Sequence, residues 1–203
     1  MTIALQFYGD SISGNCYKLK LAAAELGLEY IWHETDILAG DTQAASFLRL
    51  NPNGKVPLAI LPDGLVLAES NAILSFLADG TSLAGSGRYE RACILQWLFF
   101  EQYSHEPYIA TSRFIVKYLN NPPERQSDLA EKKSGGYKAL AVMERQLDSQ
   151  RFITNDEYSI ADIALYAYTH VAGEGGFELD QYPRVREWLQ RIEERPRFVP
   201  MRS

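Results

Sequence analysis

Two neighbouring motifs carry the residue types needed to hold a small peptide. The first is the segment 51–57 (NPNGKVP), and the second is the pair Glu69 and Ser70. Pro57 has no N–H for a sheet ladder and suits the start of a short apolar strand. A cis Val56–Pro57 bond would leave the N–H and C=O of Val56 for a bound peptide. Glu69 and Ser70 begin the next helical run, where outward-pointing N–H groups favour an anion. Together the motifs predict a site that binds a small peptide by its backbone and its carboxylate.

The elements around these motifs predict a small α/β domain. Apolar patterns predict strands at residues 3–8, 30–35, 56–60 and 65–68, and helices at 14–26, 42–50 and 69–78. Residues 62–64 (PDG) mark the turn between the last two strands. The order βαβ followed by ββα is that of a single α/β layer of about eighty residues.

The rest of the chain predicts a second, helical domain. Residues 80–87 (GTSLAGSG) have the composition of a flexible linker. The expected helices cover residues 88–119 with a bend near Pro107, then 127–150 and 185–194. Ser159 and Asp162 fit a helix capping box, with serine at the N-cap and the acid at N3. The expected domains are therefore 1–79, the linker 80–87 and an all-helical domain 88–203.

Composition excludes several classes of function. The chain of 203 residues has a net charge of -6 and a pI near 5.2, which disfavours nucleic-acid and anionic-membrane partners. No apolar run approaches the ~20 residues of a membrane span, and the N-terminus shows no basic region with a cleavage site. We therefore expect a cytoplasmic protein that acts on a small molecule. Cys16 and Cys93 are too few for a disulfide framework and are expected as thiols.

The sequence implies neither a metal nor a nucleotide. Cysteines, histidines and acidic residues have no metal-ligand spacing, and no GxGxxG or P-loop string occurs. His33, His105 and His170 show no spacing that suggests a catalytic triad.

Four segments in this order resemble those of the soluble glutathione S-transferases. They are residues 11–18 (SISGNCYK), 51–57, 69–73 (ESNAI) and 159–162 (SIAD). The resemblance covers essentially the whole chain and is to serine-type, bacterial-like members. It implies a thioredoxin-like α/β N-terminal domain followed by an all-α C-terminal domain. It also implies a homodimeric detoxification enzyme whose co-substrate is glutathione.

The resemblance assigns a role to each site residue. It implies that Ser13 contacts the sulfur of glutathione, and that Val56, at the Pro57 turn, pairs with the backbone of its cysteinyl residue. Glu69 and Ser70 would hold the γ-glutamyl end, and Lys55 would meet the glycyl carboxylate.

Two alternatives to Ser13 remain open at the sulfur. Ser11 lies in the same loop, and a shift of one or two residues would exchange the two serines, while Ser13 also suits a helix cap. Cys16 lies in the first turn of a helix, where the dipole favours thiolate, but it also lies on the apolar stripe, where cysteine is usually a core residue.

The implied chemistry is conversion of the glutathione thiol to thiolate, followed by attack on a small, mostly apolar electrophile. The aromatic residues available to contact that electrophile are Phe100, Tyr103 and Tyr108, with Phe114 beyond them. A first alternative is a glutathione-dependent thiol-disulfide or peroxide reductase that works through Cys16. A second is a non-catalytic glutathione-binding regulatory module, against which the retained Lys55, Val56–Pro57 and Glu69–Ser70 argue.

Overall fold

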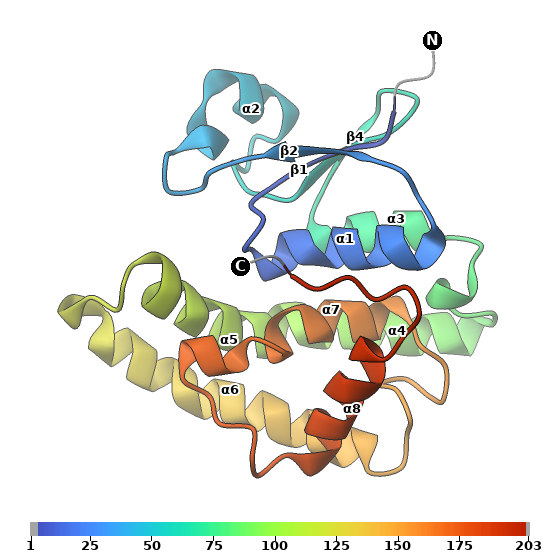
Figure 1. Ribbon diagram of the computed structural model, residues 1–203, viewed down its shortest axis with the longest axis vertical. Coiled ribbons are helices and arrows are strands. Elements are labelled where there is room, and N and C mark those ends of the chain that lie inside the picture. Colours follow the sequence, from blue (N-terminus) through green and yellow to red (C-terminus); the bar gives the residue numbers. More distant parts are fainter. Residues whose placement is uncertain (1–3, 202–203) are drawn as a thin grey trace. The chain divides into compact units, whose positions relative to one another are not determined.

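The computed structural model describes residues 4–201, which form two compact units, residues 4–79 with 197–201 and residues 80–196 (Figure 1). The sequence predicts that residues 197–203 belong to the helical domain. The structure instead groups 197–201 with the first unit, because the Tyr17 hydroxyl donates to the Val199 carbonyl at 2.6 Å and Arg197 donates to the Glu25 carbonyl at 2.7 Å. The expectations for residues 1–3 and 202–203 lie outside the described residues.

The first unit contains a mixed four-stranded sheet in the order β2-β1-β3-β4. The strands are β1 (Gln6–Gly9), β2 (Ile31–Glu34), β3 (Leu58–Ile60) and β4 (Val66–Ala68). β1 and β2 are parallel, whereas β3 is antiparallel to both β1 and β4. β3 begins at Leu58, after the proline, because proline offers no N–H to the ladder.

Helices cover both sides of this sheet. α1 (Gly14–Leu26) has the predicted bounds and lies with α3 (Ser70–Ala78) against one face (Figure 1). α2 (Ala45–Leu50), preceded by the 3-10 turn η1 (Asp41–Gln43), lies on the other side (Figure 1). The core of the unit lies between the sheet and α1 and α3, and includes Leu5, Phe7, Leu19, Ala23, Ala59, Leu61 and Ile73.

The second unit is helical throughout its regular structure. Its α-helices are α4 (Arg88–Phe100), α5 (Glu106–Arg113), α6 (Gln126–Leu147), α7 (Ile160–Thr169) and α8 (Pro183–Glu193). Its other helical segments are η2 (Ser82–Ala84), η3 (Glu101–His105), η4 (Phe114–Tyr118), η5 (Pro123–Arg125) and η6 (Ala172–Gly175). The predicted helical run 88–119 is present from Arg88 to Tyr118, and it contains two π-helical segments, η3 and η4. Pro107 lies in the first turn of α5, just after η3, where a missing N–H is tolerated.

α7 is the buried centre of the helical unit, with every residue from Ile160 to Thr169 inaccessible. The predicted capping box is present, since Ser159 and Asp162 hydrogen-bond reciprocally. The Asp162 carboxylate also accepts from Ile153 N at 2.8 Å and Trp188 Nε1 at 2.9 Å. These observations confirm an α/β N-terminal unit followed by an all-α unit. Within residues 4–201, no helix has both the length and the apolarity to cross a bilayer.

Candidate functional site

The register of the sheet brings the predicted motifs to one edge. The last pairs before the proline are Tyr8 with Leu58 and Leu58 with Ala68. Continuing this register by one residue sets Pro57 between the end of β1 and Glu69. The loop into α1, the proline turn and the start of α3 therefore meet at the same edge of the sheet.

The proline turn has a cis Val56–Pro57 peptide bond and is held by Asn51. The buried amide of Asn51 donates to the Lys55 carbonyl at 2.7 Å. Gly54 has φ +60°, a left-handed conformation that strains most other residues, so the turn favours glycine. Val56 precedes the paired part of β3, which starts at Leu58. This role of Asn51 is not among the expectations from the sequence, although its Asn-Pro dipeptide is a turn signal.

Glu69 and Ser70 form the entry to α3. Glu69 is exposed and has φ +70°, a backbone conformation that costs a non-glycine residue about 1–3 kcal/mol. Ser70 is the first residue of the helix and is buried. The outward N–H groups of the first turn of α3 thus begin directly after an exposed carboxylate.

Ser13 is the N-cap of α1. Its backbone is extended, with φ -78° and ψ 128°, and its buried hydroxyl oxygen accepts from Cys16 N at a long 3.5 Å. Ser13 thus stands where both a helix cap and a ligand-binding hydroxyl are expected.

Cys16 is a buried thiol. Burial raises the pKa of Cys16 to about 12, against the lowering effect of the Ser13 hydroxyl and the Asp10 backbone. A Cβ on Gly9 would lie 2.9 Å from Cys16 Sγ, which shows how closely the chain packs around the sulfur. The helix dipole therefore does not make this sulfur a thiolate near neutral pH.

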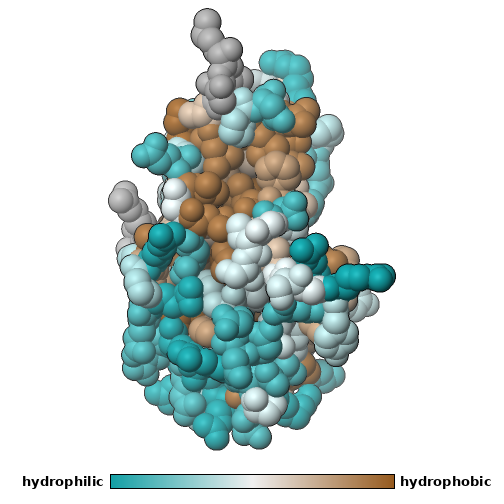
Figure 2. Space-filling model, turned by 90° about the vertical axis from the view of Figure 1, so that its right-hand side faces the viewer, coloured by the Kyte–Doolittle hydropathy of each residue, from teal (hydrophilic) through white to brown (hydrophobic). Residues whose placement is uncertain are grey.

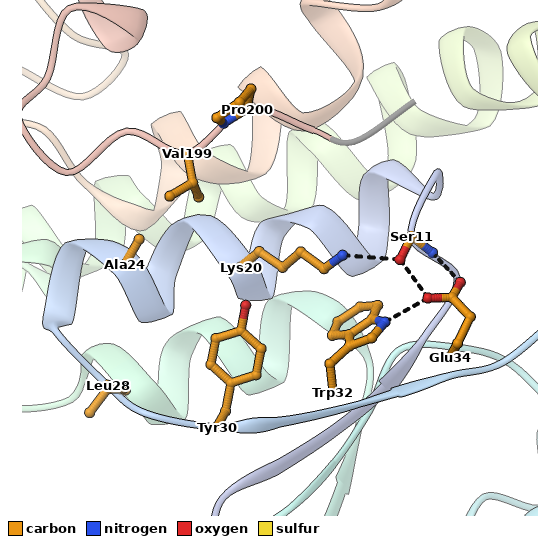
Figure 3. A pocket seen from close by; sticks show the side chains of 9 residues that line it. All are labelled: Ser11, Lys20, Ala24, Leu28, Tyr30, Trp32, Glu34, Val199 and Pro200. Atoms are coloured by element: carbon orange, nitrogen blue, oxygen red, sulfur yellow. Dashed lines mark hydrogen bonds between the residues drawn. The ribbon is translucent and has the colours of Figure 1, made fainter.

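Ser11 faces a separate pocket of about 600 Å³ between α1, β2 and the C-terminal segment (Figure 3). Its lining residues are Ser11, Lys20, Ala24, Leu28, Tyr30, Trp32, Glu34, Val199 and Pro200. The Ser11 hydroxyl donates to Glu34 at 2.5 Å and accepts from Lys20 Nζ at 3.2 Å. Although partial burial raises it, the hydrogen bonds from Ser11 and Trp32 hold the pKa of Glu34 below its usual value. The pocket contains none of the other predicted site residues.

Lys18 and Asn15 hydrogen-bond the start of α1 to the start of α3, and neither residue has a role among the expectations from the sequence. Lys18 is fully buried, and its Nζ donates to Ser70 Oγ at 3.1 Å and to Asn71 Oδ1 at 3.1 Å. Ser70 Oγ donates to Asn15 Oδ1 at 3.3 Å. The sequence offered no signal that singles out Lys18, because Lys20 lies two residues further along the same helix and only the structure shows which lysine is buried.

The three aromatic residues predicted to contact an electrophile have different environments. Phe100 packs edge-on against Trp97, with ring centroids 4.9 Å apart. The ring of Tyr108 lies directly against Gly135. Tyr103 is 84% exposed and is the least constrained of the three by packing.

The histidines make hydrogen bonds to residues outside the predicted site. His33 contacts Gln6 Oε1 at 2.8 Å, and His105 contacts the Thr169 hydroxyl at 2.9 Å. Between residues 4 and 201, no group of three or more histidines, cysteines or acids is arranged to hold a metal ion.

A thioredoxin-like unit with a cis-proline turn, followed by an all-helical unit, defines the fold of the soluble glutathione S-transferases. Residues 12–79 match the glutathione S-transferase N-terminal domain, and residues 92–196 match the glutathione S-transferase C-terminal domain. The chain therefore belongs to the glutathione S-transferase family.

Individual relatives agree with this assignment. Disulfide-bond oxidoreductase YfcG of Escherichia coli is 31% identical over 190 residues, which cover 90% of this chain and 87% of that protein. A glutathione S-transferase structure from Pseudomonas fluorescens is 55% identical, with a TM-score of 0.97 and coverage of 99% of this chain and 100% of that one. A glutathione transferase from Burkholderia graminis, with two glutathione molecules bound per subunit, is 28% identical, with a TM-score of 0.84 and coverage of 96% and 85%. The chain is thus an enzyme, a glutathione transferase.

Proposed function

We propose that the protein binds glutathione at the edge of the sheet and activates its thiol as thiolate through Ser13. The thiolate then attacks a small, mostly apolar electrophile. The observation that carries this proposal is the position of the cis Val56–Pro57 turn between the end of β1, which leads to Ser13, and Glu69. The glutathione bound to the Burkholderia graminis relative supports the choice of peptide.

The tripeptide is held through its backbone and its charged ends. The N–H and C=O of Val56 pair with the cysteinyl residue, as a strand would. The Ser70 hydroxyl and the first turn of α3 bind the γ-glutamyl carboxylate, and the exposed Glu69 carboxylate binds the γ-glutamyl amine. Lys55 is exposed beside the turn and meets the glycyl carboxylate.

Ser13 and the start of α1 supply enough free energy to ionise the thiol. Lowering a thiol pKa from ~8.5 by about two units requires roughly 2.7 kcal/mol. A hydroxyl that donates to an anion contributes ~1.5–3 kcal/mol, and a helix N-terminus adds about 0.3–1 kcal/mol. The proton passes to solvent, and the sulfur lone pair forms the new C–S bond to the electrophile. The attacked carbon gives up an electron pair in return, either to a leaving group that departs as an anion or into a conjugated system that solvent then protonates. No general base is required.

Ser13 is preferred to the two alternatives because of their surroundings. The Ser11 hydroxyl is engaged by Glu34 and Lys20 in the other pocket. Cys16 is buried, and its pKa of about 12 opposes ionisation.

An ultraviolet difference titration of the protein with glutathione tests the proposal, because it detects bound thiolate. We expect the bound thiol of the wild type to have a pKa about two units below that of free glutathione. Ser13→Ala should reverse at least one unit of that shift, to judge by the free energy of a hydroxyl–anion bond, about 1.5–3 kcal/mol. Ser11→Ala is the matched control and should retain most of the shift. An unshifted thiol in the wild type contradicts the proposal, and binding without thiolate is the result expected of a non-catalytic glutathione-binding module.

Disulfide reduction is a second candidate, favoured by the similarity to the oxidoreductase YfcG. In this reaction the glutathione thiolate attacks one sulfur of a disulfide, forms a mixed disulfide with it and releases the other sulfur as thiolate. Measuring both conjugation and disulfide reduction in Cys16→Ser shows whether reduction depends on Cys16 or on bound glutathione alone. If reduction is lost while conjugation remains, the reductase works through Cys16.

We also propose a cytoplasmic homodimer that serves in detoxification. Apolar residues gather over one face of the first unit (Figure 2). Exposed large apolar side chains occur in both units, among them Leu65, Phe76, Leu95, Phe99 and Tyr103. Such surfaces are typical of subunit contacts. Among the three aromatic residues predicted to contact the electrophile, the exposed Tyr103 is also the first candidate for that contact. Sedimentation velocity tests the dimer, and a monomer at micromolar concentration would contradict it.

A further inference from the structure

Lys18 is the least expected side chain near the proposed site. It lies on α1 with an exposed fraction of 0%. A lysine is rarely buried completely, because removing an ammonium from water costs several kcal/mol unless it is hydrogen-bonded. Its ammonium is directed at the first turn of α3, where it donates to Ser70 Oγ and Asn71 Oδ1, each at 3.1 Å.

This contact fixes which way the Ser70 hydroxyl donates. An ammonium has three donors and no acceptor, so Ser70 Oγ is the acceptor in its bond with Lys18. The hydroxyl proton must then point elsewhere, and in the structure it points to Asn15 Oδ1 at 3.3 Å. That bond is longer than the usual O–H···O distance of about 2.7–2.8 Å, so a better acceptor can replace it.

The same contact makes Ser70 a stronger donor. A hydroxyl that accepts a hydrogen bond from a cation is polarised, and its own proton binds acceptors more tightly. The positive charge of Lys18 also adds to the positive potential of the N-terminal turn of α3. Both effects favour a carboxylate as the acceptor.

We propose that Lys18 is a positioning residue that orients and polarises the Ser70 hydroxyl toward the γ-glutamyl carboxylate of glutathione. Lys18 itself does not touch the substrate. This inference rests on the proposed function, because it gives Lys18 a part in the affinity and specificity of the same site.

The test compares glutathione with cysteinylglycine, a dipeptide that has the same thiol and lacks the γ-glutamyl group. In Lys18→Met, the preference for glutathione, measured as a ratio of kcat/KM values, should fall about 10- to 150-fold, the range for losing a charged hydrogen bond. The loss should lie in KM for glutathione, with kcat and KM for the electrophile nearly unchanged. General damage to the fold would lower both activities together and leave the ratio intact.

Two further variants sharpen the test. Ser70→Ala should lower the same ratio, and the double variant should be no worse than the more impaired single variant, because Lys18 acts through Ser70. The matched control is Lys20→Met, two residues further along α1. The Lys20 ammonium donates to the Ser11 hydroxyl and lies over the Trp32 ring, 3.8 Å from the ring centroid (Figure 3). Because neither contact involves Ser70 or α3, the substrate ratio should not change in Lys20→Met.

A measurement on the wild type covers the case in which Lys18→Met does not fold. The ¹⁵N signal of the Lys18 ammonium should shift when glutathione binds and stay in place with cysteinylglycine. An unchanged signal with saturating glutathione, or an unchanged substrate ratio in Lys18→Met, overturns the inference and leaves the proposed function standing. If the wild type does not saturate with glutathione, the proposed function fails and the inference fails with it.

Discussion

Cys16 illustrates, at the scale of single residues, how burial decides the chemistry of a side chain. Its place in the first turn of α1 favours thiolate through the helix dipole, by about 0.3–1 kcal/mol. Burial is the larger effect and raises the pKa of Cys16 to about 12. Position in a helix therefore does not by itself make a reactive cysteine.

The high pKa of the buried Cys16 thiol predicts that Cys16 is modified slowly in the folded protein. At pH 8, a pKa of about 12 leaves roughly one thiol in ten thousand ionised. With iodoacetamide, we expect the half-buried Cys93 to react first and Cys16 to react only after urea is added. Mass spectrometry of tryptic peptides measures both rates. Rapid native alkylation of Cys16 would show that its thiol is accessible and more acidic than its burial indicates.

At the scale of elements, α7 shows how a short local sequence signal fixes the start of a helix. The signal is a serine followed by an acidic residue three positions later. The same Asp162 carboxylate also binds the loop before α7 through Ile153 N, and it binds α8 through Trp188 Nε1. Burial raises the pKa of Asp162, and its hydrogen bonds act against that rise. One side chain thus caps α7 and ties it to α8.

Removing this carboxylate should destabilise the protein far more than removing the cap hydroxyl. Asp162→Ala leaves several buried donors unpaired and should cost about 3–5 kcal/mol of unfolding free energy. Ser159→Ala removes one capping bond and should cost about 1 kcal/mol. Urea unfolding of both variants measures the difference. Equal costs would mean that the bonds to Ile153 and Trp188 contribute little.

His170, just after α7, should make stability depend on pH. Burial lowers the pKa of His170 to about 4; Arg113 also lowers it, while the Tyr166 carbonyl and Glu174 raise it. The unfolded chain, with a pKa near 6.5, then binds a proton that the native state does not. The stabilisation is complete above pH 6.5 and is lost as pH falls toward 4.

The size of this effect follows from the shift, which corresponds to at most about 3 kcal/mol. His170→Gln removes the titrating ring, so its unfolding free energy should fall less than that of the wild type between pH 7 and pH 4.5. Urea titrations at the two pH values make the comparison. Parallel losses in the two proteins would assign the acid sensitivity to other groups.

The C-terminal segment matters at the scale of the whole molecule, because it returns the chain to its first unit. Residues 197–201 follow the last helix of the second unit and bind α1 through Tyr17 and Arg197. The first unit thus consists of two stretches of chain separated by the whole helical unit. Its stability depends on a segment that is distant in sequence.

We therefore predict that Tyr17→Phe loosens this segment. Loss of the 2.6 Å bond to the Val199 carbonyl should cost about 0.5–1.5 kcal/mol and should speed trimming by carboxypeptidase. Tyr89→Phe is the control, because Tyr89 is 84% exposed. Mass spectrometry over a digestion time course measures the trimming. Equal rates in the two variants would indicate that the tyrosine bond does not hold the segment.

The sequence by itself determined the elements and their order. The bounds of α1, the capping box of α7 and the turn at residues 62–64 follow from nearby residues, because capping, glycine stops and proline turns depend on local backbone chemistry. The segment 51–57 also indicated where the cis-proline turn lies. Periodicity also indicated the helical run 88–119, but it did not indicate that η3 and η4 within that run are π-helical.

Only the tertiary structure decided which side chains are buried and which hydrogen-bond partners each of them has. It directs Ser11 into a second pocket, buries the Cys16 thiol, sets Lys18 beneath Ser70 and joins residues 197–201 to the first unit. The physical reason is that hydrogen-bond partners and desolvation come from residues brought close by sheet register and helix packing. In the sequence, Ser11 and Ser13 look interchangeable, and so do Lys18 and Lys20. Packing gives each of them different neighbours.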